Sequence, residues 1–366
     1  MEFVLSELSE QVMTARAAQR PLHIRGGASK RFYGEATDLE DLNSHVVLDL
    51  SGYCGIVNYQ PSELVITARA GTLLSDIERT LAEQNQMLAF EPPRFSPAST
   101  LGGCVAAGLA GPRRMAAGSL RDFVLGAKLL DSSGIVLEFG GEVMKNVAGY
   151  DVSRLLAGSM GIFGALVEVS LKVAPKPFQE STVALACTEA EALESFNRWR
   201  GQPLPISATC WHASDGEKDG RLWVRVSGST PAVASGLQKI GGQLVDPREA
   251  QAFWNSLRDQ THAFFQAMPL WRVAVPPQVA PLGLGPTLIE WNGGQRWLST
   301  VASGGDLRAQ VAALGGHATV FRYDPKRLDV PVFHPLDTGL MSVSRRLKQE
   351  LDPMGIFNPK RLFTEF

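Results

Sequence analysis

Glycine and tryptophan are distributed very unevenly along this 366-residue chain, and this limits what it can fold into. Thirteen of the 36 glycines fall between Gly102 and Gly164, whereas all seven tryptophans lie between Trp199 and Trp297. Dense glycine lets the backbone approach a ligand closely, and clustered tryptophan indicates a core of large aromatic side chains. Chain length also predicts two domains. We therefore expect a first domain with a backbone-lined ligand site and a second, separately built domain.

Composition and charge exclude several classes of protein. The formal charge is -2, from 35 Lys and Arg against 37 Asp and Glu, so the chain lacks the positive field that captures nucleic acid. The sequence contains no run of about 18 apolar residues, which is the length needed to span a membrane. Its N-terminus resembles an amphipathic helix rather than a signal peptide. The four cysteines are scattered and no HExxH spacing occurs, so we expect a reducing compartment and no metal bound by this chain.

Hydrophobic periodicity predicts a mixture of strands and helices in both halves of the chain. The predicted strands are 45–50, 64–70 and 165–173 in the first half, and 222–226, 271–275, 287–291 and 317–321 in the second. The predicted helices are 73–84, 248–265 and 339–351. Two prolines within 174–177 stiffen the chain after a strand and mark a domain boundary.

Three glycine-rich segments are candidates for a ligand site. The segment 25–30 (RGGASK) could converge backbone N–H groups on an anion, although taken alone it could equally be a surface turn. The uncharged segment 97–108 could lie against a planar ligand or form a buried turn. The segment 158–164 spaces its glycines GxxGxxG before a strand, unlike the GxGxxG of a Rossmann turn, and no GxxxxGK[ST] occurs. A nicotinamide dehydrogenase and an NTPase are therefore disfavoured.

Taken in order, these segments resemble the PCMH-type FAD-binding domain of the vanillyl-alcohol oxidase family. The resemblance rests on RGGASK, ASTLGGCVAAG, GSLRDFVLGAKLLDSSG, KNVAGYDVSRLLAGSMGIFGALVEVSLK and the terminal MGIFNPKRL. The stretches 24–34 and 144–151 are more narrowly similar to the family of FAD-binding E subunits of bacterial glycolate oxidases. The resemblance implies an α+β fold: an FAD-binding domain of two α/β subdomains (1–176), a smaller α/β cap domain (177–334), and a C-terminal segment with a helix that returns to the FAD domain (335–366).

The resemblance also implies which residues bind FAD. Backbone amides of one turn would hold the pyrophosphate, and these residues are Arg25, Gly26, Gly27, Ala28, Ser29 and Lys30. A second turn would complete this cradle with Thr100, Leu101, Gly102 and Gly103. Gly118, Ser119 and Asp122 match the segment that lines the other side of the cofactor. Gly161, Ile162, Gly164 and Val167 would wall the adenosine half, and 358–360 match a terminal motif that folds back to the first domain.

The chain departs from the family pattern at two positions near the pyrophosphate. Ala28 stands where many relatives have a third glycine, which narrows the available backbone conformations. No His or Cys occurs within 24–34, the turn in which some relatives attach flavin covalently. We therefore expect FAD to be bound non-covalently, and we expect Cys104 to be a small packing residue.

The sequence assigns no catalytic residue. Hydroxy-acid-oxidising relatives carry a GDGNxH-like motif that this chain lacks, and His212, His262, His317 and His334 are isolated from one another in the sequence. Arg272 and Arg322 are candidates for binding a substrate carboxylate, with Glu290 and His334 as candidate proton acceptors. These side chains are more often solvated or ion-paired than functional. We expect that this chain does not oxidise a 2-hydroxy acid by itself.

The resemblance implies an FAD-binding subunit of a multi-subunit glycolate oxidase or dehydrogenase, which takes part in oxidising glycolate to glyoxylate. The expected partners are a catalytic flavoprotein subunit and an iron–sulfur subunit that receives the electrons, because four scattered cysteines do not form a ferredoxin-type cluster. Two alternatives stay open: a self-sufficient FAD-dependent 2-hydroxy-acid dehydrogenase, and an FAD-binding assembly subunit without turnover. We expect a cytoplasmic location, with contact to the inner membrane only through the complex.

Overall fold

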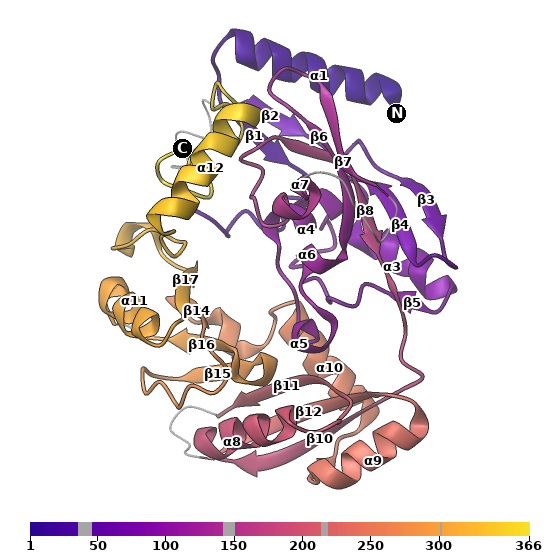
Figure 1. Cartoon of the computed structure of the whole chain (residues 1–366), viewed down its shortest axis with the longest axis vertical. Helices are drawn as coiled ribbons and strands as arrows, with labels where there is room; N and C mark the ends of the chain where they lie inside the picture. The colour runs from indigo at the N-terminus through magenta and orange to yellow at the C-terminus, as the bar shows by residue number, and fades with distance from the viewer. Residues whose placement is uncertain (36–45, 142–150, 214–218, 301) are drawn as a thin grey trace. The chain divides into compact units, whose positions relative to one another are not determined.

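The computed structural model describes residues 1–35, 46–141, 151–213, 219–300 and 302–366 (Figure 1). Residues 1–109, 119–175 and 335–366 form one compact unit, called unit 1. Residues 110–118 and 176–334 form a second compact unit, called unit 2. No helix in these described ranges is long and apolar enough to cross a membrane.

The described part of unit 1 contains three sheets, and the two larger ones differ in their pairing. A parallel pair joins β1 (Leu22–Arg25) to β2 (Val46–Asp49), and Phe357 near the end of the chain bridges to Leu22. A five-stranded antiparallel sheet has the order β3 (Ile56–Gln60), β4 (Val65–Arg69), β8 (Ala165–Lys172), β6 (Val124–Leu130) and β7 (Val136–Gly140). A short pair joins β5 (Gln86–Met87) to β9 (Ala174–Pro175). The two larger sheets give this unit the two α/β parts that the sequence predicted.

The helices of unit 1 follow local sequence signals. They are α1 (Glu2–Ala17), α3 (Leu74–Glu83), α4 (Leu101–Ala107), α6 (Leu120–Phe123), α7 (Val152–Leu155) and α12 (Thr338–Leu351). Helix α3 buries Leu74, Ile77 and Leu81, which recur at helical spacing. The Asp151 carboxylate accepts a hydrogen bond from the Arg154 N–H and so begins α7.

Unit 2 is built on one eight-stranded antiparallel sheet. Its strand order is β13 (Gln243–Leu244), β10 (Gln179–Cys187), β12 (Gly220–Gly228), β11 (Ile206–His212), β15 (Thr287–Glu290), β16 (Gln295–Ser299), β14 (Leu270–Ala274) and β17 (His317–Arg322). Its α-helices are α5 (Arg114–Ala117), α8 (Glu189–Arg200), α9 (Thr230–Ile240), α10 (Pro247–Arg258) and α11 (Gly304–Ala313). Short 3-10 turns are η1 (Ala263–Gln266), η2 (Trp291–Gly293) and η3 (Pro325–Arg327).

The helix predicted over 248–265 is wrong in its second half. Helix α10 ends at Arg258, and residues 263–266 form the separate turn η1. Gln260 lies between them with a φ of 55°, a left-handed conformation that an α-helix does not contain. The apolar spacing continued through this break, so periodicity alone did not reveal it.

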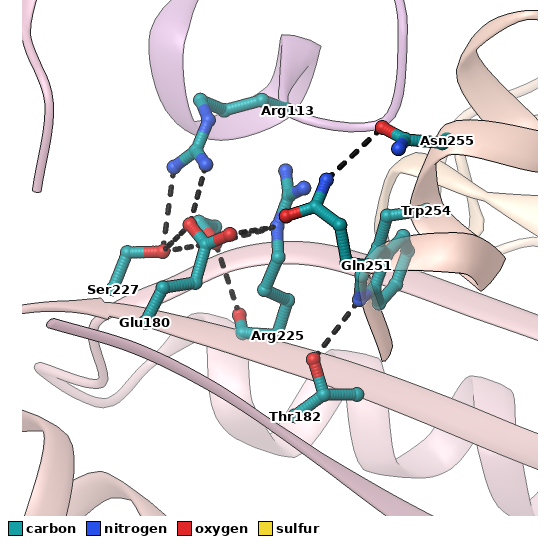
Figure 2. Close-up of polar contacts among 9 residues, drawn as sticks. Arg113, Glu180, Thr182, Arg225, Ser227, Gln251, Trp254 and Asn255 are labelled. Carbon is teal, nitrogen blue, oxygen red and sulfur yellow. Dashed lines mark hydrogen bonds and ion pairs between the residues drawn. The ribbon is translucent and has the colours of Figure 1, made fainter. Parts of the chain in front are cut away.

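The segment 110–118 also differs from the sequence-based domain ranges, which placed it within 1–176. It belongs to unit 2. The guanidinium of Arg113 donates to the carboxylate of Glu180 at 2.5 Å (Figure 2), and the indole N–H of Trp291 donates to the carbonyl of Gly111 at 3.1 Å. Both partners are distant in sequence, and a local pattern does not indicate such contacts.

Glu180 is the centre of a polar cluster in unit 2 (Figure 2). The hydroxyl of Ser227 donates to the carboxylate of Glu180 at 2.6 Å, and the Nε of Arg225 lies 3.8 Å from it. The guanidinium of Arg225 also lies 5.0 Å from the ring centroid of Trp254. Burial raises the pKa of Glu180, but Arg225 and Arg113 outweigh burial and hold this pKa below its usual value. The carboxylate is therefore ionised at neutral pH.

Candidate functional site

Unit 1 contains a cavity of about 330 Å³ that is lined mainly by backbone and small side chains. That volume is at the lower end of the range for small-molecule sites. Four segments far apart in sequence contribute to it: the end of β1 with the turn 26–31, the beginning of α4, residues 160–166, and the tail residues Asn358 and Arg361. The two glycine-rich turns singled out by the sequence therefore meet at one site.

The two turns are packed directly against each other. A Cβ atom added at Gly27 would lie 1.4 Å from the carbonyl oxygen of Ala98, and one added at Gly26 would lie 2.4 Å from the Oγ1 of Thr100. Real Cβ atoms do not approach other atoms so closely, so a side chain at Gly27 would force the turns apart. Glycine is required here by the close approach of two backbones.

The first turn presents a run of backbone donors that the protein does not satisfy. Within the part of the chain that the structure describes, the N–H groups of Gly26, Gly27, Ala28 and Ser29 have no hydrogen-bond acceptor. Buried backbone donors in folded proteins almost always have a partner, and consecutive amides along a cavity wall suit a ligand rich in acceptors. Ala28 has a φ of 52°, and a left-handed residue within a turn is typical of backbone nests that bind anions.

Charged side chains border this turn. The buried amine of Lys30 donates to the hydroxyl of Ser99 at 2.7 Å, which fixes it against the second turn. The guanidinium of Arg25 lines the cavity but forms an ion pair with Asp49 at 2.6 Å. Arg25 therefore brings less unbalanced charge to the cavity than its sequence position suggested.

The C-terminal tail closes one side of the cavity. The side chain of Asn358 accepts a hydrogen bond from the N–H of Ile24 at 2.9 Å and donates to the carbonyl of Met160 at 2.7 Å. The guanidinium of Arg361 donates to three backbone carbonyls, those of Arg31, Tyr33 and Glu35. The tail thus ties both walls together. The sequence placed 358–360 beside the first domain but missed Arg361, whose partners are backbone atoms and leave no sequence signal.

Behind the tail, a buried ion pair fixes helix α12. The amine of Lys348 donates to the carboxylate of Asp352 at 2.6 Å and to the carbonyls of Ile162 and Phe357. Burial lowers the pKa of Lys348 from its usual value, and Asp352 acts in the opposite direction. This pair anchors the last turn of α12 beside the residues that lead to Asn358.

The predicted cofactor residues fall into two groups. Those that line the cavity are Arg25, Gly26, Gly27, Ala28, Ser29, Lys30, Thr100, Gly102, Gly103, Gly161 and Gly164. Leu101, Ile162 and Val167 do not line it, because their side chains are buried in the protein core. Cavity residues that the sequence did not single out include His23, Met160 and Leu166.

The segment around Asp122 does not line the cavity either. The Asp122 carboxylate accepts hydrogen bonds from the N–H and the hydroxyl of Ser119 and so begins α6, while Gly118 belongs to unit 2. Most of the KNVAGYD motif, residues 145–150, lies outside the described residues. Cys104 is fully buried, and burial raises the pKa of its thiol to about 11, so it is a protonated packing residue.

Unit 2 carries a second polar constellation, on strands β14, β15 and β16. The Nε of Arg272 donates to Gln295 at 2.8 Å, and the amide of Gln295 donates to the buried carboxylate of Glu290 at 3.2 Å. The indole N–H of Trp297 donates to the same carboxylate at 2.7 Å. Glu290 is therefore a buried acceptor that orients its neighbours. Arg322, the other candidate cation, lies at the end of β17, and burial lowers its pKa.

The histidines that are isolated in sequence lie in pairs in the structure. The ring centroids of His212 and His262 are 4.8 Å apart, and those of His317 and His334 are 6.2 Å apart. Burial lowers the pKa of His212 to about 4, with His262 and Arg221 acting in the same direction. His212 also lines a second cavity, beside Arg221. Among the described residues no group of three or more His, Cys, Asp or Glu could hold a metal ion.

Comparison with known proteins decides the family. The family described as "FAD binding domain" matches residues 5–140. The chain is 42% identical over 361 residues to the glycolate oxidase subunit GlcE of Escherichia coli (strain K12), which covers 98% of this chain and 97% of that one. The chain belongs to the GlcE family. The FAD-binding domain of this GlcE family member includes both turns of the cavity.

More distant relatives match a smaller share of this GlcE family member. The glycolate oxidase subunit GlcD of Bacillus subtilis (strain 168) is 33% identical over 129 residues, 35% of this chain and 27% of that protein. Among solved structures, an alkyldihydroxyacetonephosphate synthase superposes with a TM-score of 0.67 at 15% identity, covering 97% of this chain and 74% of that one. This structural likeness confirms the α+β fold across both units.

Proposed function

We propose that the chain is the FAD-binding subunit of a multi-subunit complex that oxidises glycolate to glyoxylate, and that the cavity of unit 1 binds the diphosphate of FAD. The observation that carries this assignment is the run of N–H groups from Gly26 to Ser29, which lies beside the cavity and has no acceptor among the described residues. A diphosphate offers several charged acceptor oxygens within the reach of such a run. The FAD-binding family match over residues 5–140 and the likeness to GlcE support it.

The cavity residues take different roles in this proposal. Gly26, Gly27, Ala28 and Ser29 donate to phosphate oxygens, and Lys30 adds charge from behind the turn. The second turn packs against them through Thr100 and lines the same cavity with Gly102 and Gly103, while Gly161 and Gly164 face the cavity from the opposite wall. When bound, FAD supplies a centre that takes up two electrons as a hydride and can release them singly. The protein supplies binding and orientation.

We further propose a catalytic flavoprotein subunit and an iron–sulfur subunit as partners. The word "subunit" in the names of GlcE and GlcD supports an assembly. In this proposal the iron–sulfur ligands belong to another chain. The four cysteines of this chain lie far apart in sequence, and no two of them form the closely spaced pair that a cluster-binding motif contains. We place the complex in the cytoplasm, with any membrane contact made through the partners.

Purification of the chain alone tests cofactor binding directly. We expect a yellow protein with about one FAD per chain, and we expect acid precipitation to release all of the FAD into the supernatant because it is held non-covalently. A colourless protein that stays colourless after incubation with FAD would contradict the proposal. Flavin that stays in the acid pellet would contradict non-covalent attachment. His23, which lines the cavity, would then be the candidate for a covalent link to the flavin.

Anaerobic addition of glycolate tests the division of work within the complex. We expect the flavin absorbance of the isolated chain to persist and that of the assembled complex to bleach. Rapid bleaching in the isolated chain would instead identify a self-sufficient 2-hydroxy-acid dehydrogenase. Undiminished complex activity with a Gly27→Val chain that has lost its FAD would identify an assembly subunit without turnover.

A further inference from the structure

Around strand β14, the large sheet of unit 2 has one apolar face and one face that carries polar side chains. Trp271 and Val273 of β14 pack in a hydrophobic cluster with Leu307 and Val311 of α11. Side chains alternate along a strand, so Arg272 points to the opposite face. Strand pairing places Trp297 and Thr319 directly beside Arg272 on that face. The Arg272 cation thus lies on the face of β14 that α11 does not cover.

Arg272 is held in one orientation by a chain of hydrogen bonds. Its Nε donates to Gln295, which in turn donates to Glu290, and Glu290 is fixed by the indole N–H of Trp297. Its guanidinium carbon also lies 5.3 Å from the ring centroid of Trp291. These contacts use the Nε and the flat face of the guanidinium. The edge formed by its two terminal nitrogens makes no hydrogen bond to any described residue.

Arg272 differs from four other arginines of unit 2 in having no carboxylate of its own. Among the described residues no Asp or Glu forms an ion pair with it, because Gln295 stands between it and Glu290. Other unit 2 arginines do have carboxylates within 4 Å: Arg113, Arg225, Arg258 and Arg296. A fixed, unpaired guanidinium edge fits the two oxygens of a carboxylate.

Two further groups add donors to the same place. The guanidinium of Arg114 lies 4.5 Å from the ring centroid of Trp291, the same ring that Arg272 contacts. His317 is next to Ala274 in the β14–β17 pairing, two residues along from Arg272 on the same face. Burial, Arg272, His334 and Arg114 all lower the pKa of His317, so its imidazole is neutral at pH 7 and can donate or accept a hydrogen bond.

We propose that Arg272, supported by Arg114 and His317, forms a binding site on unit 2 for a small carboxylate. The proposal rests on the proposed function in one respect: it takes this carboxylate to be that of the 2-hydroxy acid, glycolate. Gln295 and Glu290 are positioning residues that hold the guanidinium, and Trp291 supports its flat face. Carboxylate binding by unit 2 does not require that this chain alone carries out the oxidation.

Equilibrium dialysis of the FAD-loaded chain against labelled glycolate, without oxygen, tests this site. The variants are Arg272→Gln, which removes the charge, and Arg272→Lys, which keeps it without the paired donors. Arg221→Gln is the matched control, because Arg221 also lies over a tryptophan, 4.2 Å from the ring centroid of Trp223, but pairs with Glu249. Glycolamide, which lacks the carboxylate, and inorganic phosphate are the comparison ligands.

We expect Arg272→Gln to weaken glycolate binding at least about tenfold and Arg272→Lys to weaken it less, as loss of a paired charged contact predicts. Arg221→Gln should bind glycolate like the wild type, and glycolamide should not compete. Glycolate binding by Arg272→Gln that equals the wild type would overturn the proposal, as would stronger competition by phosphate than by glycolate. The FAD content of each variant reports separately on the proposed function, because Arg272 is not among the residues that line the unit 1 cavity.

Discussion

The two units present ligands with opposite kinds of surface. The cavity of unit 1 is lined by backbone amides and small side chains. The two turns that form it can pack against each other because Gly26 and Gly27 have no Cβ atom. The polar face of unit 2 is formed by long side chains that hold each other in place: Arg272, Gln295, Glu290 and Trp297. A site of the first kind should fail when a side chain is added, and a site of the second kind when one is removed.

The largest effect is expected for Gly27→Val. The new Cβ would meet the carbonyl of Ala98 at 1.4 Å, so the two turns would separate and the run of amides would lose its shape. We expect FAD affinity to fall by more than about 100-fold, or about 3 kcal/mol, measured by FAD titration of the apoprotein. Gly52→Val is the control, because a Cβ added at Gly52 would meet no atom within 4 Å and Gly52 does not line the cavity. An equal loss of FAD affinity in both variants would show that the close approach of the two turns is not what the cavity requires.

In unit 1, removal of a cavity side chain should lower stability mainly in the C-terminal tail, whose side chains bind the backbone of the cavity walls. Asn358→Ala leaves the N–H of Ile24 and the carbonyl of Met160 without a partner, and two such buried groups cost on the order of 3 kcal/mol in the free energy of unfolding. Urea unfolding monitored by circular dichroism measures this loss. Asn255→Ala is the control, since its side chain bonds only to exposed Gln251 and should change stability by less than about 0.5 kcal/mol.

In unit 2 the matching test is Glu180→Gln. The change leaves Arg113 and Arg225 without their carboxylate, and because Glu180 is one-third exposed we expect a loss of about 2 kcal/mol rather than the full cost of a broken buried pair. Glu249→Gln removes an exposed carboxylate 3.6 Å from Arg221 and should cost about 0.5 kcal/mol or less. Indistinguishable urea midpoints for the two variants would show that the cluster of Figure 2 does not stabilise unit 2.

The free energy of unfolding should depend on pH through His212 of unit 2. The pKa of His212 is about 4 in the folded chain and about 6.5 when unfolded, so acid favours the unfolded state, which binds the proton first. The stabilisation is complete above about pH 6.5 and is lost progressively towards pH 4, by about 1–2 kcal/mol at pH 5. His212→Gln should flatten this part of the profile, measured by urea unfolding between pH 5 and 8. If the free energy of unfolding of His212→Gln falls with acid as steeply as that of the wild type, His212 is not the group responsible.

The smallest effect is expected for Ala28→Gly. Ala28 has a φ of 52°, which costs an alanine roughly 1 kcal/mol, and glycine removes this strain while adding freedom to the unfolded chain. We expect a net gain of up to about 0.5 kcal/mol in thermal stability of the apoprotein, with FAD affinity retained. A clear loss of stability would show that the turn relies on the alanine methyl group for packing.

The sequence predicted the unit 1 site far better than the unit 2 site. The turns at Gly26 and Gly102 have compositional signatures, because only small residues permit two backbones to meet, and such signatures are local. Arg272 was named as one of two candidate cations, but nothing in its neighbourhood distinguished it from Arg322. Its distinguishing property is the intervening Gln295, which depends on the pairing of β14 with β16 and on the absence of a nearby carboxylate.

The same reasoning explains the errors in the fold. The strands and helices with clear periodicity, such as α3 and β8, were predicted to within two residues. The break at Gln260 and the membership of 110–118 in unit 2 were missed, since a single left-handed residue and an ion pair between Arg113 and Glu180 leave the apolar pattern unchanged. Backbone conformation at one residue and pairing across long sequence distances are properties of the folded chain.

The hydrogen bonds of Asn358 have a consequence for biosynthesis. The first wall of the cavity, at Ile24, is translated near the beginning of the chain, but its partner Asn358 is translated more than three hundred residues later. A ribosome-bound chain that already contains both glycine turns therefore still has an open pocket. Cofactor loading should follow the synthesis of Asn358, and a product terminated before Asn358 should leave synthesis with its ligand site unfinished.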